Sequence, residues 1–130
     1  MTGLGGFNLI GFVPISDVDR SVAFYRDKLG LRFVSDESPF AVVFEANGLM
    51  LRLGLGSQQK PTGGTILGWQ VRDISVIVQQ LLQAGVAFER YSFMQQDESG
   101  VWTTPTGAKV AWFKDPDGNV LSVSEHPEWA

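Results

Sequence analysis

The fold is decided by a pattern that occurs twice: residues 8–30 read NLIGFVPISDVDRSVAFYRDKLG, and residues 65–85 read TILGWQVRDISVIVQQLLQAG. Each copy begins with an apolar, alternating segment, passes through an aspartate into a helical pattern, and ends at a glycine. A repeat of this length indicates that the chain is built from similar supersecondary units. Two copies are too few for a solenoid, so we expect a pair of modules with a cleft between them, where small ligands commonly bind.

Length and composition narrow the class of protein. The 130 residues suit a single domain over 1–130, and 44% apolar with 18% charged residues is ordinary for a globular core. A net charge of −4 leaves no basic face for nucleic acid. No apolar run approaches the roughly 18 residues of a membrane span, and the first residues lack the basic stretch of a signal peptide. The absence of cysteine excludes disulfides, thiolate metal sites and a cysteine nucleophile, and we expect a cytoplasmic location.

Two amphipathic helices are predicted, one over residues 17–28 and the other over 74–84. In both segments apolar residues recur at the spacing of one helical face. Asp17 and Asp73 precede these stripes and are expected to cap the helix N-termini. A glycine follows each helix and provides the left-handed conformation that ends it.

Strands are predicted on both sides of each helix. Asn47-Gly48 predicts a two-residue hairpin turn, because both residues tolerate a positive φ. The sequence DPDGN at 115–119 predicts a second hairpin turn. The eight expected strands cover residues 9–14, 31–35, 40–46, 49–55, 65–71, 86–92, 109–114 and 120–124.

Two segments lie outside this regular pattern. The polar, glycine-rich residues 54–64 join the modules, which we place at about 4–56 and about 65–126. Residues 93–107 are expected to form a loop, and loops of this length in compact domains are often functional. This loop contains Trp102, and its large apolar ring favours a lid over the cleft.

Both ends of the repeat carry a resemblance to a known family. Residues 17–25 read DVDRSVAFY, LGL follows at 29–31, and this pattern resembles the first module of the vicinal oxygen chelate superfamily. That superfamily includes glyoxalase I, extradiol dioxygenases, and fosfomycin and bleomycin resistance proteins. Residues 113–121, FKDPDGNVL, are similar to its last hairpin. The resemblance implies an α+β fold of two βαβββ modules, whose curled mixed sheets surround a cleft, and a homodimer in which both subunits contribute to that cleft.

The resemblance also locates the metal ligands of the catalytic members. They bind a divalent cation through His, Gln or Glu on the first and last strands of each module. In this sequence those positions are Ile10, Arg52, Ile66 and Ser122. None is a residue that a divalent metal prefers, and an arginine would repel one. The single histidine, His126, lies beyond the last strand, so we expect no metal and no other cofactor.

Strand alternation identifies a candidate anion-binding residue. Met50 and Arg52 alternate with leucines and therefore point to the opposite face of their strand, which we interpret as the cleft. The guanidinium fork of Arg52 suits a carboxylate, phosphate or enolate ligand. The alternatives are an ion pair within the protein, with a residue such as Glu45, Glu89 or Glu98, and an exposed position at the edge of the sheet.

The candidate ligand site combines an apolar floor with a few polar groups, which suits a small organic molecule. Its residues are Phe12, Met50, Arg52, Gln70, Trp102 and Ser122. No Ser/His/Asp arrangement and no phosphate-binding glycine loop accompanies them. The first hypothesis is a metal-free protein that binds a small organic ligand, expected to be anionic, in the inter-module cleft. The alternative is a glyoxalase- or dioxygenase-like lyase, isomerase or oxidoreductase with an atypical or intersubunit site, and the sequence leaves open whether the protein is an enzyme.

Overall fold

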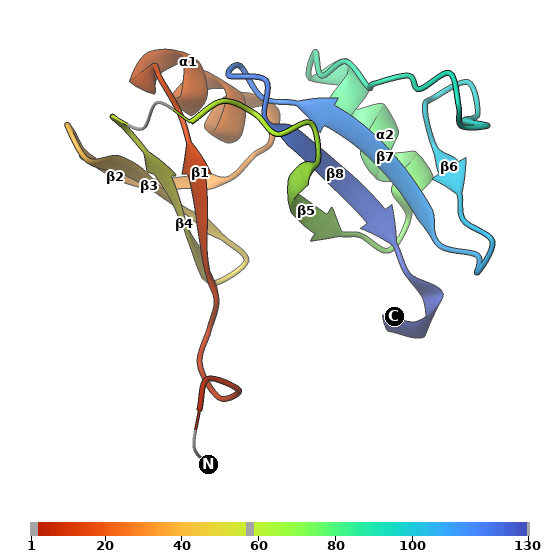
Figure 1. Ribbon diagram of the computed structural model, residues 1–130, viewed down its shortest axis with the longest axis horizontal. Coiled ribbons are helices and arrows are strands. Elements are labelled where there is room, and N and C mark those ends of the chain that lie inside the picture. The colour runs from red at the N-terminus through yellow and green to blue at the C-terminus, as the bar shows by residue number, and fades with distance from the viewer. Residues whose placement is uncertain (1–2, 57–58, 130) are drawn as a thin grey trace.

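The computed structural model describes residues 3–56 and 59–129 and has the predicted α+β architecture of two similar modules (Figure 1). Module one contains β1 (Ile10–Pro14), α1 (Val18–Val22), η1 (Ala23–Lys28), β2 (Arg32–Glu37), β3 (Ala41–Ala46) and β4 (Leu49–Gly54). Module two contains β5 (Thr65–Gln70), α2 (Ile74–Gln83), β6 (Trp102–Thr103), β7 (Lys109–Lys114), β8 (Val120–Glu125) and the short helix η2 (Pro127–Trp129).

Each module forms its own four-stranded mixed sheet. The strand orders are β1-β4-β3-β2 and β5-β8-β7-β6, so the two modules share one topology. In each sheet the first strand pairs in parallel with the last, and the other pairs are antiparallel. A parallel pair needs a crossover connection, which the helix and the middle strands of the module provide. The repeat in the sequence is therefore a repeat of topology.

The helices begin where the sequence predicts. The Asp17 carboxylate accepts the backbone N–H of Arg20 at 2.9 Å and caps α1. The helix expected over 17–28 continues from α1 into η1, where the N–H of Leu29 reaches the carbonyl of Phe24 at 3.0 Å in a π-helical bond. This wider turn brings Phe24 and the adjacent Tyr25 into the core together. Among the described residues, no helix is long and apolar enough to cross a membrane.

The prediction of a strand over residues 86–92 is wrong. That segment makes only an isolated bridge between Phe88 and Phe113, and the fourth strand of the sheet is β6, inside the segment expected to be a loop. The Gln96 side chain explains the difference: it accepts the N–H of Tyr91 at 2.7 Å and donates to the carbonyl of Glu89 at 3.0 Å. These backbone groups are therefore satisfied by a side chain instead of a strand ladder.

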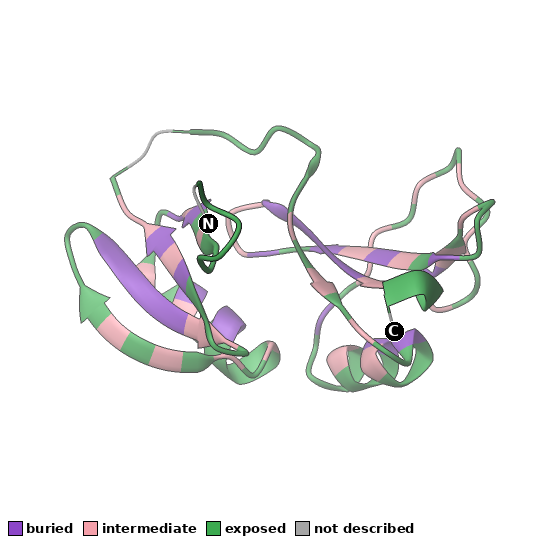
Figure 2. Ribbon diagram, turned by 90° about the horizontal axis from the view of Figure 1, so that it is seen from below, coloured by how far each residue is buried: buried purple, intermediate pink, exposed green. Residues whose placement is uncertain are grey.

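The core lies on the face of each sheet that the helices cover. Figure 2 marks the buried residues in purple. One continuous apolar cluster includes residues of both modules. Phe24 of η1 and Phe113 of β7 meet across the junction with ring centroids 6.3 Å apart. Phe113 also contacts the rings of Trp69 and Phe88, so its side chain links the second sheet to the first helix.

A buried polar cluster fastens the last turn of module two to module one. The Asp115 carboxylate accepts the Tyr25 hydroxyl at 2.8 Å and the Asn119 side-chain amide at 2.9 Å. It also accepts the backbone N–H groups of Asp117 and Asn119, both at 2.9 Å. Asn119 in turn donates to the carbonyl of Pro14 at 2.9 Å. Burial, followed by the charge of Asp115 and its hydrogen bond, raises the pKa of Tyr25 well above its usual range, so this phenol remains a donor.

Candidate functional site

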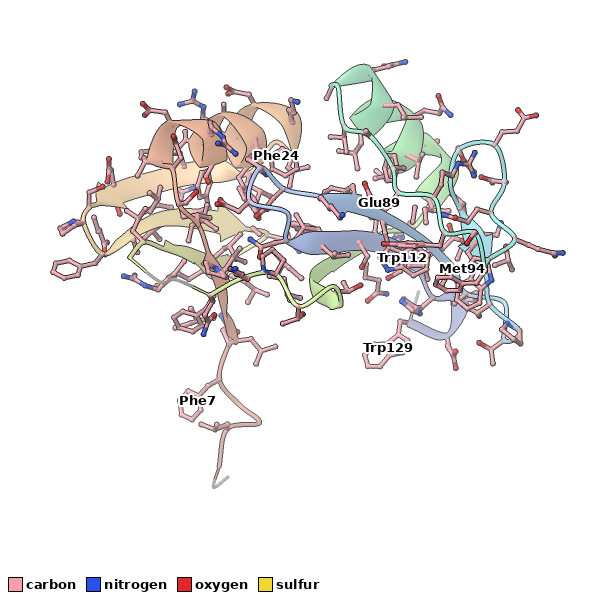
Figure 3. The ribbon with its side chains drawn as sticks, turned by 45° about the horizontal axis from the view of Figure 1, so that its top comes forward. Phe7, Phe24, Glu89, Met94, Trp112 and Trp129 are labelled. Carbon is pink, nitrogen blue, oxygen red and sulfur yellow. The ribbon has the colours of Figure 1, made fainter. Side chains whose placement is uncertain are left out.

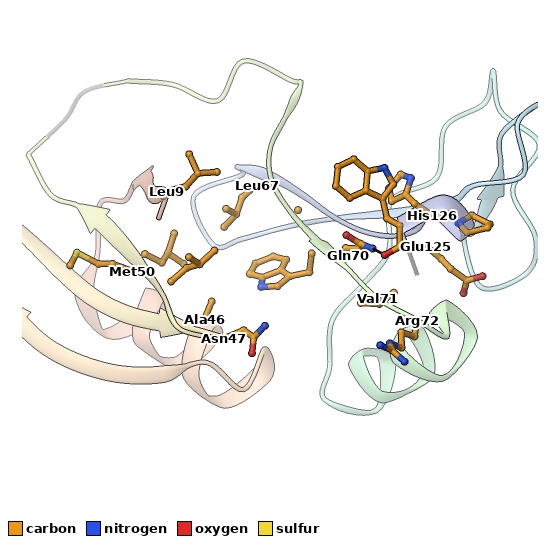
Figure 4. Close-up of a pocket in the computed structure, with 17 residues that line it drawn as sticks. Leu9, Ala46, Asn47, Met50, Leu67, Gln70, Val71, Arg72, Glu125 and His126 are labelled. Carbon is orange, nitrogen blue, oxygen red and sulfur yellow. Dashed lines mark hydrogen bonds between the residues drawn. The ribbon is translucent and has the colours of Figure 1, made fainter. Parts of the chain in front are cut away.

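A cavity of about 820 Å³ lies at the junction of the modules (Figure 4). Its walls come from β1, β4 and the β3–β4 turn of module one, and from β5, the connection between β5 and α2, and the C-terminal segment of module two. Pockets of this size hold most small organic ligands of proteins. The cavity therefore occupies the inter-module position that the repeat predicts.

The inner wall of the cavity is apolar. Leu49 and Leu51 line it from β4, and Leu67 and Trp69 line it from β5. Trp69 is held in place because its indole stacks on Phe113, with centroids 6.5 Å apart and an interplanar angle of 18°. This wall offers hydrocarbon and aromatic surface that an organic ligand would remove from water.

Polar groups occupy the C-terminal side of the cavity. Gln70 donates from Nε2 to the carbonyl of Trp129 at 3.0 Å, which holds the terminal segment near β5. His126 lines the cavity, and its Nε2 lies 2.8 Å from the hydroxyl oxygen of Ser124. Sequence reasoning missed His126 as a site residue, although Ser122, Ser124 and His126 alternate along one face of β8 and its extension. That alternation was the available signal.

Two more polar side chains line the cavity from opposite sides, Asn47 from the β3–β4 turn of module one and Arg72 from the residue before the α2 cap in module two (Figure 4). Neither side chain has a hydrogen bond or ion pair within residues 3–56 and 59–129. Glu125 also lines the cavity, but its carboxylate accepts the N–H of Ile74 at 3.0 Å and so completes the cap of α2. Sequence reasoning missed Arg72 and Asn47, because nothing in the sequence around either residue indicates that it lines a cavity shared with the other module.

Only part of the site predicted from the sequence lies at this cavity. Met50 and Gln70 line it. The other four residues occupy the sheet faces: Phe12 and Arg52 are paired positions of β1 and β4, Ser122 lies on β8, and Trp102 lies on β6. The structure thus divides the predicted set between the cavity and the two open sheet faces.

Arg52 alternates with buried leucines as expected, since Leu51 and Leu53 are in the core and Arg52 is only partly buried on the opposite face. Its guanidinium Nη2 lies 3.0 Å from the Glu37 carboxylate, and Nη1 lies 3.8 Å from the Met50 sulfur. Hydrogen bonds, first that of Arg52, hold the pKa of Glu37 below its usual range. The charge of Arg52 therefore has a partner in the protein, and that partner differs from the three glutamates considered from the sequence.

Trp102 stands in β6 instead of a loop and does not line the cavity. Its ring lies 6.2 Å from Trp112, whose indole meets Tyr91 edge to face at 5.6 Å. Trp112 also donates from its indole nitrogen to the Thr65 hydroxyl at 3.0 Å. These aromatic rings form a row across module two, where Figure 3 places Trp112 beside the loop that carries Met94.

The positions at which catalytic relatives hold a metal do not suit one here. Ile10 lies beside Met50 in the β1–β4 register, one row away from Arg52, so the first module offers hydrocarbon, a thioether and a cation. In the second module the corresponding residues are Ile66 and Ser122. Among the described parts of the chain, no three His, Cys, Asp or Glu side chains gather as a metal-binding group. Divalent metals prefer carboxylate, imidazole or thiolate ligands, so these residues do not fit a resident cation.

The fold and this site define a two-module architecture with a cavity between the modules, and sequence comparison gives its family. The profile of the Glyoxalase/Bleomycin resistance protein/Dioxygenase superfamily matches residues 6–123. The chain therefore belongs to this superfamily, which confirms the resemblance seen at the repeat and the last hairpin. A search of curated proteins found no match.

Solved structures with the same fold extend over nearly the whole chain. A superfamily member from Sphaerobacter thermophilus DSM 20745 is 26% identical, with a TM-score of 0.72 and coverage of 93% of this chain and 98% of that one. Lactoylglutathione lyase from Agrobacterium tumefaciens is 20% identical, with a TM-score of 0.75 and coverage of 98% and 99%. A superfamily protein from Nocardioides is also 20% identical, with a TM-score of 0.74 and coverage of 99% and 89%. The last two similarities concern the fold alone.

Proposed function

We propose that this protein binds a small organic molecule in the cavity between its two modules, without a divalent metal. The observation that supports the proposal most strongly is the cavity of about 820 Å³, in which an apolar inner wall faces a few polar groups at the rim. Such a combination gives affinity through burial of apolar surface and orientation through sparse hydrogen bonds. A cytoplasmic location, expected from composition, is part of the same proposal.

Native mass spectrometry after incubation with a metabolite extract tests the binding function. We expect a noncovalent complex with a small organic molecule that disappears in Leu49→Trp, because the added ring fills the cavity beside a residue that is 41% exposed. Val34→Trp is the matched control, since Val34 is 44% exposed on β2 and does not line the cavity. Equal loss in both variants, or no complex with wild type, would refute the proposal.

The metal-free part of the proposal rests on the chemistry of Ile10, Arg52, Ile66 and Ser122, which offers no carboxylate or imidazole ligand at the expected positions. We expect elemental analysis of dialysed protein to find well below one Zn, Ni, Mn or Fe per chain. Binding of the ligand should also be insensitive to EDTA. A zinc protein carried through the same dialysis is the control, and near-stoichiometric metal in this protein would contradict the proposal.

We also propose a homodimer, because the protein carries apolar side chains that its own fold leaves uncovered. Phe12 is 70% exposed on the open face of β1, and Phe7 is 74% exposed on the arm that projects beyond β1 (Figure 3). Apolar groups exposed together commonly mark an interface. Sedimentation velocity at micromolar concentration should give twice the monomer mass of 14.3 kDa, and a single 14.3 kDa species would contradict the dimer.

An enzymatic role is the second candidate, and one contact favours it. The Ser124 hydroxyl oxygen lies 2.8 Å from His126 Nε2 at the edge of the cavity, a geometry in which histidine can accept a proton. This candidate predicts that wild type converts a component of the extract into a new product. His126→Gln should then abolish conversion while the substrate still binds, whereas unchanged turnover would exclude a role for this histidine.

A further inference from the structure

We infer that the ligand is an amphipathic organic monocarboxylate, whose carboxylate binds Arg72 and whose apolar body packs against Trp69 and Leu49. This inference rests on the proposed function and names the chemical class of its ligand. The anion then binds Arg72 at the cavity rim, and not Arg52 on the open sheet face, which the sequence had suggested.

Arg72 is the arginine whose charge is available. Within residues 3–56 and 59–129 its side chain has no hydrogen bond or ion pair, whereas every other arginine is engaged. The engaged ones are Arg20 with the carbonyl of Pro116, Arg26 with Asp27, Arg32 with Glu45, Arg52 with Glu37, and Arg90 with the carbonyls of Asp97 and Glu98. A guanidinium fork at a cavity rim, without a protein partner, matches the two oxygens of a carboxylate.

Asn47 supplies a second polar contact from the other module. Its backbone φ of 50° is fixed by the β3–β4 hairpin turn, and its side-chain amide makes no hydrogen bond within the described parts of the chain. The same turn is anchored because the Glu45 carboxylate accepts the N–H of Gly48 at 2.8 Å. Figure 4 places Asn47 and Arg72 on opposite sides of the cavity, one on each module. Asn47 is therefore available to a polar substituent at the other end of the ligand, while the carboxylate binds Arg72.

The charge balance of the cavity favours a single negative charge. Arg72 is the one arginine or lysine among the described residues that line the cavity, and Glu125 contributes a carboxylate to the same cavity. The whole chain has a net charge of −4, which further disfavours a dianion such as a phosphate monoester. On the inner wall the leucines and the Trp69 ring offer mainly apolar surface, so the part of the ligand that lies against this wall is expected to be apolar as well.

Isothermal titration calorimetry with two probes of equal ring size tests the inference. The probes are 2-naphthoate, which carries the carboxylate, and 2-naphthalenemethanol, which is neutral. We expect Arg72→Gln to weaken naphthoate binding about tenfold or more while the affinity for the alcohol stays within about twofold.

Arg32→Gln and Arg52→Gln are the matched controls, since both side chains are paired with glutamates and neither lines the cavity. Both should bind naphthoate like wild type. Undiminished naphthoate binding in Arg72→Gln would overturn the inference. A larger loss of affinity in Arg52→Gln would overturn it too, and would indicate that the anion binds on the open sheet face. No binding of either probe to wild type would also overturn it, while the experiment with the metabolite extract decides the proposed function separately.

Discussion

Asp115→Ala is expected to lower the free energy of unfolding by about 3 kcal/mol or more, because it removes the acceptor on which a buried cluster depends. The Tyr25 hydroxyl, the Asn119 side chain and two backbone N–H groups all donate to this carboxylate. Without it these donors stay buried and unsatisfied, and each costs about 1–3 kcal/mol in a non-additive way. The loss should be large because the cluster also joins the two modules.

Urea unfolding followed by far-ultraviolet circular dichroism measures this effect. Asp27→Ala is the control, because the Arg26–Asp27 pair is exposed and should leave the unfolding midpoint unchanged. Tyr25→Phe combined with Asp115→Ala completes a double-mutant cycle that isolates the 2.8 Å hydrogen bond. If Asp115→Ala unfolds at the same urea concentration as Asp27→Ala, the buried cluster is not what fastens the modules together.

Phe113→Ala is expected to cost about 3–5 kcal/mol, the range for deleting a fully buried phenylalanine ring. Phe113 is 0% exposed and contacts the rings of Phe24, Trp69 and Phe88, so its removal leaves a cavity shared by both modules. Because the core is continuous, we expect one cooperative transition for both modules in wild type and variant alike.

Phe93→Ala provides the matched comparison, since Phe93 is 78% exposed and contacts only the ring of Tyr91 among the aromatic residues. It should change the free energy of unfolding by no more than about 0.5 kcal/mol. Thermal unfolding by calorimetry distinguishes the outcomes. Two separate transitions in Phe113→Ala, with one at the wild-type temperature, would show that the modules are independent domains and contradict the single domain expected over 1–130.

Local patterns in the sequence were sufficient to predict most of the helices, strands and turns of the fold. Helical stripes begin at Asp17 and Asp73 because these carboxylates cap the first turns. The hairpins at Asn47-Gly48 and 115–119 follow from residues that tolerate turn geometry. The prediction of a strand over 86–92 was wrong because of another local effect. The Gln96 side chain forms hydrogen bonds with backbone groups of that segment, which are then not available to a strand ladder.

The site was less predictable because it depends on contacts between distant segments. Strand parity correctly placed Arg52 opposite the buried leucines, but its partner Glu37 lies on β2, which reaches it only through the register of the sheet. Arg72 and Asn47 belong to different modules. That both residues line one cavity depends on how the buried polar cluster at Asp115 orients the modules, which no local pattern encodes.

The location of the ligand is the central claim, and the four tryptophans of the chain test it directly. Trp69 and Trp129 line the cavity, whereas Trp102 and Trp112 belong to the aromatic row on module two and do not line it. The measurement is the indole N–H region of a proton–nitrogen correlation spectrum during titration with 2-naphthoate, with each signal assigned by single Trp→Phe variants. A ligand between the modules should shift the indole signals of Trp69 and Trp129 and leave those of Trp102 and Trp112 in place. Shifts confined to Trp102 and Trp112 would place the ligand on the open sheet face and contradict the account.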